Sequence, residues 1–493
     1  MANHRRGLIF TLTVLTVGFL AGFGLLLSPH APFTPRTTVE KFFPGTDQEV
    51  RVYHISGYQK SPTLLIVGGI QGDETAGYLT ADRYLDLKMK KGTLIIVPRL
   101  NLPSIMAGTR EGLTPDMNRL FHLSEAMEQN PDTKVVNLAK SLIRKADYVL
   151  NLHQGSGFYS PVWISNQRNP SRWGQSNIID APTFSLPNGE KLELEKFAGN
   201  VAKLTNTRIS SSAYQFKVNN TETASEDSLH KEQRQSLTFY ALTGEHKMAL
   251  GLEATKSCPV PEAVSFLTMA VNSVIQEAGI IPESLPNENI AVISAELAEE
   301  ERLQGLNIKV NNKKVFIPVG EAAVYLNKGD KIQVLSVAAK KPHQWFVRLA
   351  SSTLGNGIGQ VYQVNGNDKL IVRNGPKVVA VVDTITSPSE MEYLEVEING
   401  KSQRYKNNET ISLRRNAKME FIRVFPEPPG EEIKVNLKGF VGSKDYNDGQ
   451  DLGYTISVKD LMPQWAIGKA RKIYPIEITR QDKPLGELFL KVE

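Results

Sequence analysis

The stretch TLLIVGGIQGDE, residues 63–74, determines how the first half of this chain folds. It begins with a short apolar run rich in β-branched side chains, and glycines follow. Such a run predicts a strand that is buried on both faces of a parallel or mixed sheet. Ligands of open α/β sheets bind beyond the ends of these strands. Gln71 and Glu74 therefore lie where a binding site is expected, and both carry oxygen atoms that can bind a cation.

Two later stretches have the same form. The segment ADYVLNLH ends on His153, and MALGLEAT presents Glu253 near its end. One metal site built from Gln71, Glu74 and His153, with Glu253 facing a bound water, accounts for all three strand ends. Catalytic zinc takes three protein ligands and keeps a fourth position open. Glu74 then stays deprotonated as a ligand, while Glu253 accepts the proton of the water and passes it to the leaving amine.

Strands alternate with helices in the rest of this region. Apolar residues recur at helical spacing over 75–87, and GTLIIVP at 92–98 is the next strand. This order predicts an α/β domain over 37–281, with helices on both faces of the sheet.

The pattern changes after residue 281. A linker rich in proline and asparagine leads to short alternating segments that are separated by Asn-Asn, Gly-Asp and Gly-Asn turns. We expect a small barrel-like β domain over 287–385, with an inserted helix over 295–304, and an Ig-like β-sandwich over 388–493. Neither segment contains titratable residues at catalytic spacing. Their expected role is binding, positioning or spacing.

Composition narrows the functional class. A chain of 493 residues exceeds one hydrophobic core, which agrees with several domains. The formal net charge of +5 is small for this length, and no basic run interleaved with aromatics is present, so nucleic acid is not an expected partner. The single cysteine, Cys258, excludes an internal disulfide and a cysteine-based zinc cage.

The N-terminus predicts export. Arg5 and Arg6 precede the uncharged segment 7–28, which is about long enough to cross a bilayer. Positive residues stay on the cytoplasmic side, so the remaining chain is expected outside the inner membrane, in the periplasm. Residues 1–36 are interpreted as an uncleaved membrane anchor and a stem. A cleaved signal ending at Ala31 is the alternative, because secretory signals end at small residues.

A long polar loop follows the 92–98 strand. Its notable members are Arg110, Asn118 and Arg119, because planar guanidinium groups suit a carboxylate. Taken alone, the better interpretation is that the arginines are solvated or tie the loop to its own Asp116 and Glu111. A loop of this length inside a compact domain is nevertheless typical of function.

These positions together resemble the carboxypeptidase A-like zinc metallopeptidases, the funnelins, and the related deacylases of the aspartoacylase group. Their pattern is His-x-x-Glu after the central strand, an Arg and an Asn-Arg pair in the next loop, a second His, and a late Glu. The matching positions here are Gln71, Glu74, Arg110, Asn118, Arg119, His153 and Glu253. The resemblance covers about residues 50–280 and implies a mixed, eight-stranded-type sheet. It also implies that Arg110 stabilises the oxyanion and that Arg110, Asn118 and Arg119 hold the carboxylates of the leaving residue.

Gln71 departs from the pattern, since the family usually has histidine there. An amide oxygen is neutral like imidazole but a poorer zinc donor, so weaker metal retention is expected. Glutamine at this place is similar to one subgroup, the periplasmic peptidoglycan carboxypeptidases that set helical cell shape. Membership implies one Zn2+ per catalytic domain and removal of diaminopimelate from tripeptide muropeptides. It also implies peptidoglycan peptides as partners, besides the inner membrane at the N-terminal segment and envelope proteins at the β domains.

Two other functions stay open. One is a zinc amidohydrolase that deacylates a small N-acyl amino acid, although the export segment and the β domains disfavour it. The other is a catalytically inactive binding protein of the cell envelope, which the loss of a zinc-ligand histidine at Gln71 permits.

Overall fold

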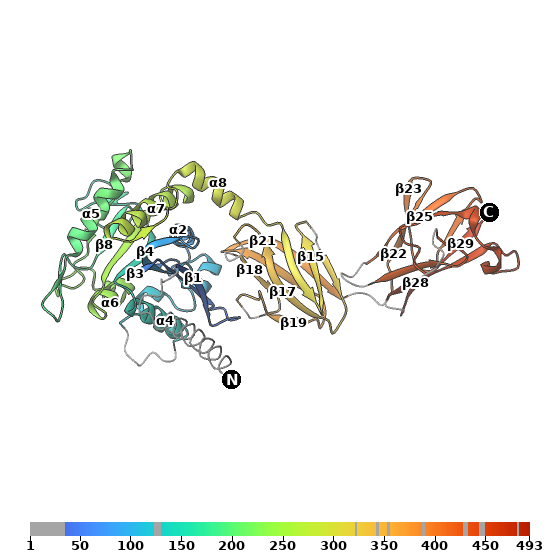
Figure 1. The fold of residues 1–493 in the computed structure, drawn as a ribbon, viewed down its shortest axis with the longest axis horizontal. Helices are drawn as coiled ribbons and strands as arrows, with labels where there is room; N and C mark the ends of the chain where they lie inside the picture. The colour runs from blue at the N-terminus through green and yellow to red at the C-terminus, as the bar shows by residue number, and fades with distance from the viewer. Residues whose placement is uncertain are drawn as a thin grey trace, which may run out of the picture. The chain divides into compact units, whose positions relative to one another are not determined.

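A computed structural model shows the fold of the chain (Figure 1). The described residues are 35–122, 130–320, 323–341, 345–352, 355–386, 390–426, 432–442, 449–480 and 483–493. The chain divides into two compact units between Glu299 and Glu300. The apolar segment predicted as an anchor, 7–28, lies outside the described residues. Within the described part of the chain, every helix is too short or too polar to cross a membrane.

The first unit is built on one mixed sheet. Its central strands β4, β3, β5 and β12 are parallel, while β1, β2 and β13 extend one side antiparallel and β8 joins β12 antiparallel. The predicted α/β fold with a mixed sheet is confirmed; eight strands form the main path, and β13 pairs with β4 beside it. In sheet order the strands are β1 (Arg36–Phe42), β2 (Val50–Ser56), β4 (Met89–Val97), β3 (Gln59–Val67), β5 (Tyr148–Gly155), β12 (Met248–Thr255), β8 (Ser176–Ile179) and β11 (Lys217–Asn220), with β13 at Ile281–Pro282.

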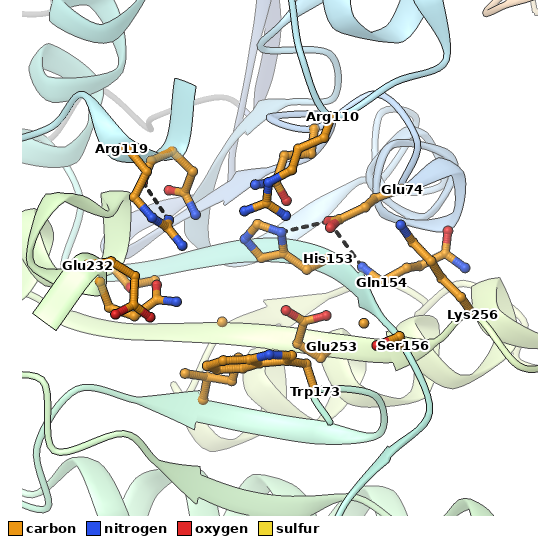
Figure 2. A pocket seen from close by; sticks show the side chains of 17 residues that line it. Glu74, Arg110, Arg119, His153, Gln154, Ser156, Trp173, Glu232, Glu253 and Lys256 are labelled. Atoms are coloured by element: carbon orange, nitrogen blue, oxygen red, sulfur yellow. Dashed lines mark hydrogen bonds and ion pairs between the residues drawn. The ribbon is translucent and has the colours of Figure 1, made fainter. Parts of the chain in front are cut away.

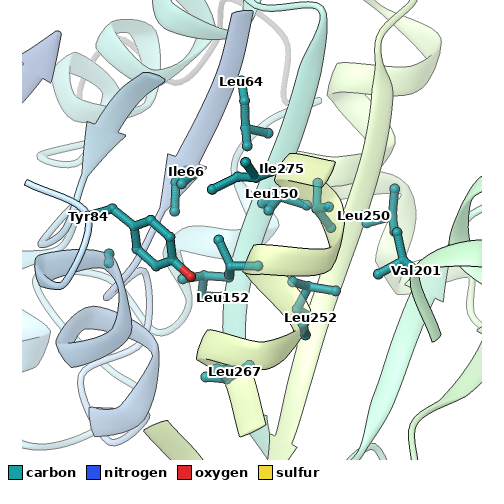
Figure 3. Packing of buried hydrophobic residues seen from close by; sticks show 14 of the residues in the cluster. Leu64, Ile66, Tyr84, Leu150, Leu152, Val201, Leu250, Leu252, Leu267 and Ile275 are labelled. Atoms are coloured by element: carbon teal, nitrogen blue, oxygen red, sulfur yellow. The ribbon is translucent and has the colours of Figure 1, made fainter. Parts of the chain in front are cut away.

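Helices cover both faces of this sheet (Figure 1). Side chains alternate along a strand, so Leu64 and Ile66 of β3 face one layer, while Leu65 and Val67 face the other. Figure 3 shows the first layer, in which Leu64, Ile66 and their neighbours on β5 and β12 pack beneath α7. The first layer contains α2 (Thr75–Asp82), α5 (Leu194–Asn206) and α7 (Val260–Glu277), and the second contains α4 (Thr133–Arg144) and α6 (Leu237–Thr243).

Helix α8 (Ile290–Glu300) differs from the helix expected over 295–304. It begins earlier because the Asn289 side chain accepts a hydrogen bond from the backbone N–H of Ala291 at 2.9 Å, as helix-capping residues do. Ile293 is fully buried in the core of the first unit, and Glu296 pairs with Arg83. The part of α8 that carries these residues therefore packs on the α/β domain, although the sequence placed it in the β region.

The second unit is entirely β apart from short 3-10 turns and the end of α8, as far as the described residues show. It contains two hydrophobic cores, one centred on the fully buried Trp345 and one on Phe421. The predicted all-β character after the first domain is confirmed. The first core lies with sheets β15-β14-β17-β19 and β16-β21-β20-β18, from β14 (Gly305–Val310) to β21 (Lys377–Thr386). The second lies with sheets β23-β22-β25-β27 and β24-β29-β28-β26, from β22 (Tyr393–Ile398) to β29 (Lys483–Val492).

The turn after β3 requires glycine. The backbone N–H of Gly72 donates to the Ser104 hydroxyl at 2.7 Å, and a Cβ on Gly72 would lie 2.0 Å from the Ser104 carbonyl oxygen. This close approach holds the turn that carries Gln71 and Glu74 against α3 (Leu102–Ala107). The same turn is closed by a hydrogen bond of 3.4 Å from the Glu74 N–H to the Gln71 carbonyl.

We predict that Gly72→Ala lowers the thermal unfolding midpoint by several degrees, because backbone must shift to admit the methyl group. Gly199→Ala is the matched control: nothing lies within 4 Å of its added Cβ, and alanine favours the helix interior by about 1 kcal/mol. Calorimetry of both variants tests this. Equal midpoints for the two would contradict the tight approach at Gly72.

Candidate active site

The seven residues singled out from the sequence line one pocket at the ends of the parallel strands. Its volume is about 370 Å³, and Figure 2 shows the side chains that surround it. His153 and Glu253 are paired neighbours across β5 and β12, so strand register alone brings them together. The pocket-lining residues predicted from the sequence are Gln71, Glu74, Arg110, Asn118, Arg119, His153 and Glu253.

Two of the three predicted metal ligands touch each other. His153 Nδ1 lies 2.7 Å from Glu74 Oε2, and the same oxygen accepts a hydrogen bond from the Gln154 N–H at 3.1 Å. Burial lowers the pKa of His153, but the Glu74 carboxylate and its hydrogen bond outweigh this, so the net pKa is raised. The Gln154 side chain accepts from the Ala76 N–H at 2.7 Å, which ties the end of β5 to the start of α2.

Gln71 is oriented by Asp116. Its Nε2 donates to Asp116 Oδ1 at 3.0 Å, and a carboxylate of lowered pKa can only accept. The Gln71 amide must therefore turn its Oε1 away from Asp116, and that oxygen is the atom with which Gln71 can bind a cation. Burial acts to raise the pKa of Asp116, but Arg110, Gln71 and Arg119 together lower it below its ordinary value.

Glu253 is the buried acid of the site. It is 8% exposed, and its Oε2 has no hydrogen-bond partner among the described residues. Burial raises the pKa of Glu253 to about 8, with His153 opposing the shift and Glu74 adding to it. A carboxylate that takes up a proton near neutral pH suits general acid–base catalysis.

The polar loop supplies cations and an amide. Arg110 donates to Asp116 Oδ2 from Nε at 3.2 Å and from a terminal nitrogen at 2.7 Å. The interpretation that Arg110 ties the loop to Asp116 is therefore correct, and Arg110 still lines the pocket with 45% of its side chain exposed. The Nη1 atom of Arg119 lies 3.9 Å from Asp116 Oδ2. The Asn118 Oδ1 accepts from the Leu237 N–H at 3.0 Å, which leaves its Nδ2 as the donor for a ligand.

Several pocket residues escaped the sequence analysis. Trp173, Glu232 and Lys256 line the pocket, and His230 packs edge-on against the Trp173 ring. Lys256 follows Glu253 by three residues at the end of the same strand. This closeness in the sequence could have indicated that Lys256 also lies at the pocket. Trp173 lies in an irregular segment and Glu232 in the short 3-10 helix Lys231–Gln235, so neither stretch has a periodicity long enough to show which side chains face inward.

The side chains present suit a divalent cation. Among the described residues, no three His, Cys, Asp or Glu side chains form a metal cluster, because one of the three donors here is the Gln71 amide. The set offers an amide oxygen, a carboxylate and an imidazole, with Glu253 beside them and incompletely paired. Amide, carboxylate and imidazole donors together fit zinc, though the amide binds it weakly.

The first unit matches the profile of a known protein family. Residues 48–283 match the profile of a family described as the catalytic domain of the carboxypeptidase controlling helical cell shape. This match covers just under half of the chain. Metallopeptidases of this kind depend on a metal cofactor.

Solved structures of one protein resemble the chain over most of its length. The apo and tripeptide-bound crystal structures of cell shape determinant Csd4 from Helicobacter pylori each have a TM-score of 0.55 at 24% identity, covering 90% of this chain and 100% of that one. The mDAP-bound form of the same protein, described as a D,L-carboxypeptidase, has a TM-score of 0.53 at 25% identity, covering 88% and 96%. A search of curated protein sequences finds no match.

We predict that Gln71→His binds zinc more tightly while keeping the fold, because imidazole is a better zinc donor than an amide. In that variant Asp116 would accept from the new ring N–H as it now accepts from the amide. Competition titration with a chromophoric chelator measures the affinity. An unchanged zinc affinity would show that Gln71 is not a ligand.

We predict that Asp116→Asn weakens zinc binding about 10- to 100-fold, as the loss of a hydrogen bond that orients a metal ligand does. An asparagine at position 116 can donate its own N–H to Gln71 Oε1. The Gln71 amide can then turn its Nε2, which cannot bind a cation, toward the pocket. The same titration tests this, and Asp47→Asn, outside the pocket, is the control. Equal affinity of the two variants would remove Asp116 from the account.

Glu253 also makes metal-free stability depend on pH. Because burial raises its pKa from 4.5 to about 8, the folded state holds a proton that the unfolded state has released, and stability falls as pH rises between these values. In the presence of a chelator, Glu253→Gln should therefore raise the unfolding midpoint at pH 8 by at least about 2 °C, and by less at pH 5. Calorimetry at both pH values measures the difference. A gain that did not grow with pH would contradict the raised pKa.

Proposed function

We propose that this chain is a periplasmic zinc-dependent carboxypeptidase that removes terminal diaminopimelate from tripeptide muropeptides and thereby modulates cell shape. One observation carries the proposal: all seven positions of the zinc carboxypeptidase pattern line a single pocket in a domain that matches the profile of the cell-shape carboxypeptidase family. A related structure binds mDAP and another binds a tripeptide, which supports a peptidoglycan peptide as the substrate here.

The residues divide the work by chemistry. Gln71, Glu74 and His153 would hold the zinc, which would supply Lewis-acid chemistry at the scissile carbonyl when bound. Glu253 takes a proton from the attacking water and delivers it to the leaving nitrogen, a role that its raised pKa suits. Arg110 places positive charge near the developing oxyanion.

The leaving residue is assigned to the end of the pocket that contains Arg119. Figure 2 shows Arg119 and Glu232 on one side of Glu253, with Lys256 and Ser156 on the other. Arg119 and the Nδ2 of Asn118 are donors suited to a terminal carboxylate. Phe121 joins their loop to the Glu232 segment through a hydrogen bond of 3.0 Å from its N–H to the Gln235 carbonyl. The acyl part of the substrate then extends toward Lys256.

The export of the chain and its attachments are proposed from the sequence. Segment 7–28, preceded by Arg5 and Arg6, is assigned to the inner membrane as an anchor. The β domains lie on the periplasmic side in this assignment, and we propose them as sites for envelope protein partners.

We predict that the purified chain, supplied with zinc, releases diaminopimelate from the tripeptide muropeptide and that Glu253→Gln reduces this about 100-fold or more. Glu195→Gln is the control, because it removes an exposed carboxylate outside the pocket and should keep full activity. Chromatography of the products, with N-acyl amino acids tested in parallel, measures the reaction. Deacylation without diaminopimelate release would favour the amidohydrolase alternative, and no turnover of either would favour the binding protein.

A further inference from the structure

Lys256 is a cation of the pocket that the proposed chemistry leaves without a task. Its backbone is fixed, since its N–H donates to the Gly155 carbonyl at 2.8 Å and the N–H of the preceding Thr255 donates to Gln175 Oε1 at 3.1 Å. The side chain is 35% exposed and lines the pocket. The fold therefore delivers a positive charge to one defined end of the site.

The partner of Lys256 leaves it able to bind a ligand. Its ammonium donates to Asp73 Oδ2 at 2.5 Å, and an ammonium has three N–H donors. Asp73 is itself 35% exposed, and pairs at such exposure stabilise a fold by only about 0–1 kcal/mol. The pair between Lys256 and Asp73 therefore adds little to the stability of the fold. A ligand carboxylate can bind the same ammonium beside Asp73.

The position of Lys256 determines which part of a substrate it meets. Arg119 occupies the opposite end, where the leaving residue is assigned, and Glu253 lies between (Figure 2). Lys256 therefore faces the acyl side of the scissile amide. The acyl residue meets Lys256 with whatever group it carries beside the scissile amide. An acidic residue keeps one carboxylate free when its other carboxyl group forms that amide, whereas a neutral residue offers only amide groups and an uncharged side chain.

We propose that Lys256 is a specificity-determining residue that binds a free carboxylate on the acyl side of the scissile amide. The site thereby selects an acyl residue with a free carboxylate over one in which that group is neutral. This inference rests on the proposed function, because that function assigns the two ends of the pocket. A lysine suits the task as a point charge on a flexible stem, since it reaches a carboxylate without fixing the plane of that group.

The test uses two peptides that differ at one group. Both are tripeptides with a γ-linked middle residue and terminal diaminopimelate; one has the free α-carboxylate on the middle residue, and in the other it is a carboxamide. Calorimetry measures their binding to the zinc-loaded full chain carrying Glu253→Gln, with and without Lys256→Met. Hydrolysis of both peptides by the wild-type chain is followed separately.

We expect the carboxylate peptide to bind about 10- to 100-fold more tightly than the carboxamide, as the loss of a charged hydrogen bond implies, and Lys256→Met to bring this ratio close to one. Glu232→Gln changes a charge at the other end of the pocket and should keep the ratio. A folding defect would weaken both peptides equally, so the ratio reports on the contact itself.

Two results would overturn the inference: equal binding of the two peptides before Lys256 is changed, or a preference that survives Lys256→Met. Loss of the proposed function looks different. If the wild-type chain hydrolyses neither peptide but the binding preference depends on Lys256, the carboxylate subsite stands and the carboxypeptidase proposal fails.

Discussion

The parallel register of β3, β5 and β12 is the constraint on which the site depends. Leu64 of β3 and Met248 of β12 both pair with Tyr148 of β5, so the three strands run in step and end at the same edge. His153 and Glu253 occupy paired positions near that edge, and the Gly72 turn returns Glu74 to it. Because both faces of these strands are packed against helices, a slip of one residue would move every inward side chain to the wrong layer.

The pocket contains ionisable side chains that are almost fully buried. Glu74 and His153 satisfy each other, whereas Glu253 keeps an oxygen without a partner among the described residues. Such burial raises the free energy of the ionised carboxylate, and the raised pKa of Glu253 expresses that cost. The packed strands and helices around it supply the stability that tolerates this arrangement, as is usual for catalytic groups.

Asp116 connects Gln71 with the polar loop that carries Arg110 and Asn118. One carboxylate oxygen accepts from the Gln71 amide and from the Asn118 backbone, and the other accepts from Arg110. The Gln71 amide has an oxygen on one side and an NH2 group on the other, so a hydrogen-bond partner decides which of the two faces the pocket. Asp116 thus fixes which face the Gln71 amide turns toward the pocket.

The strands of the first unit and the meeting of their ends could be predicted from local sequence patterns. The strands before Gln71, His153 and Glu253 are short apolar runs bounded by glycine or polar residues, and burial on both faces of a sheet leaves little choice of structure for them. The order of strands and helices then implies that their ends meet. The start of α8 was missed because its cap, Asn289, lies in a linker where asparagine is equally typical of turns.

Contacts between distant segments came only from the tertiary structure. Nothing in the local pattern shows that Asp116 meets Gln71, that Trp173 and Glu232 line the pocket, or that Lys256 meets Asp73 across 183 positions of the chain. Periodicity reports whether a residue faces the core, because burial repeats with the geometry of the backbone. It carries no information on which polar side chain meets which, because that depends on how irregular loops pack once the strands are in place.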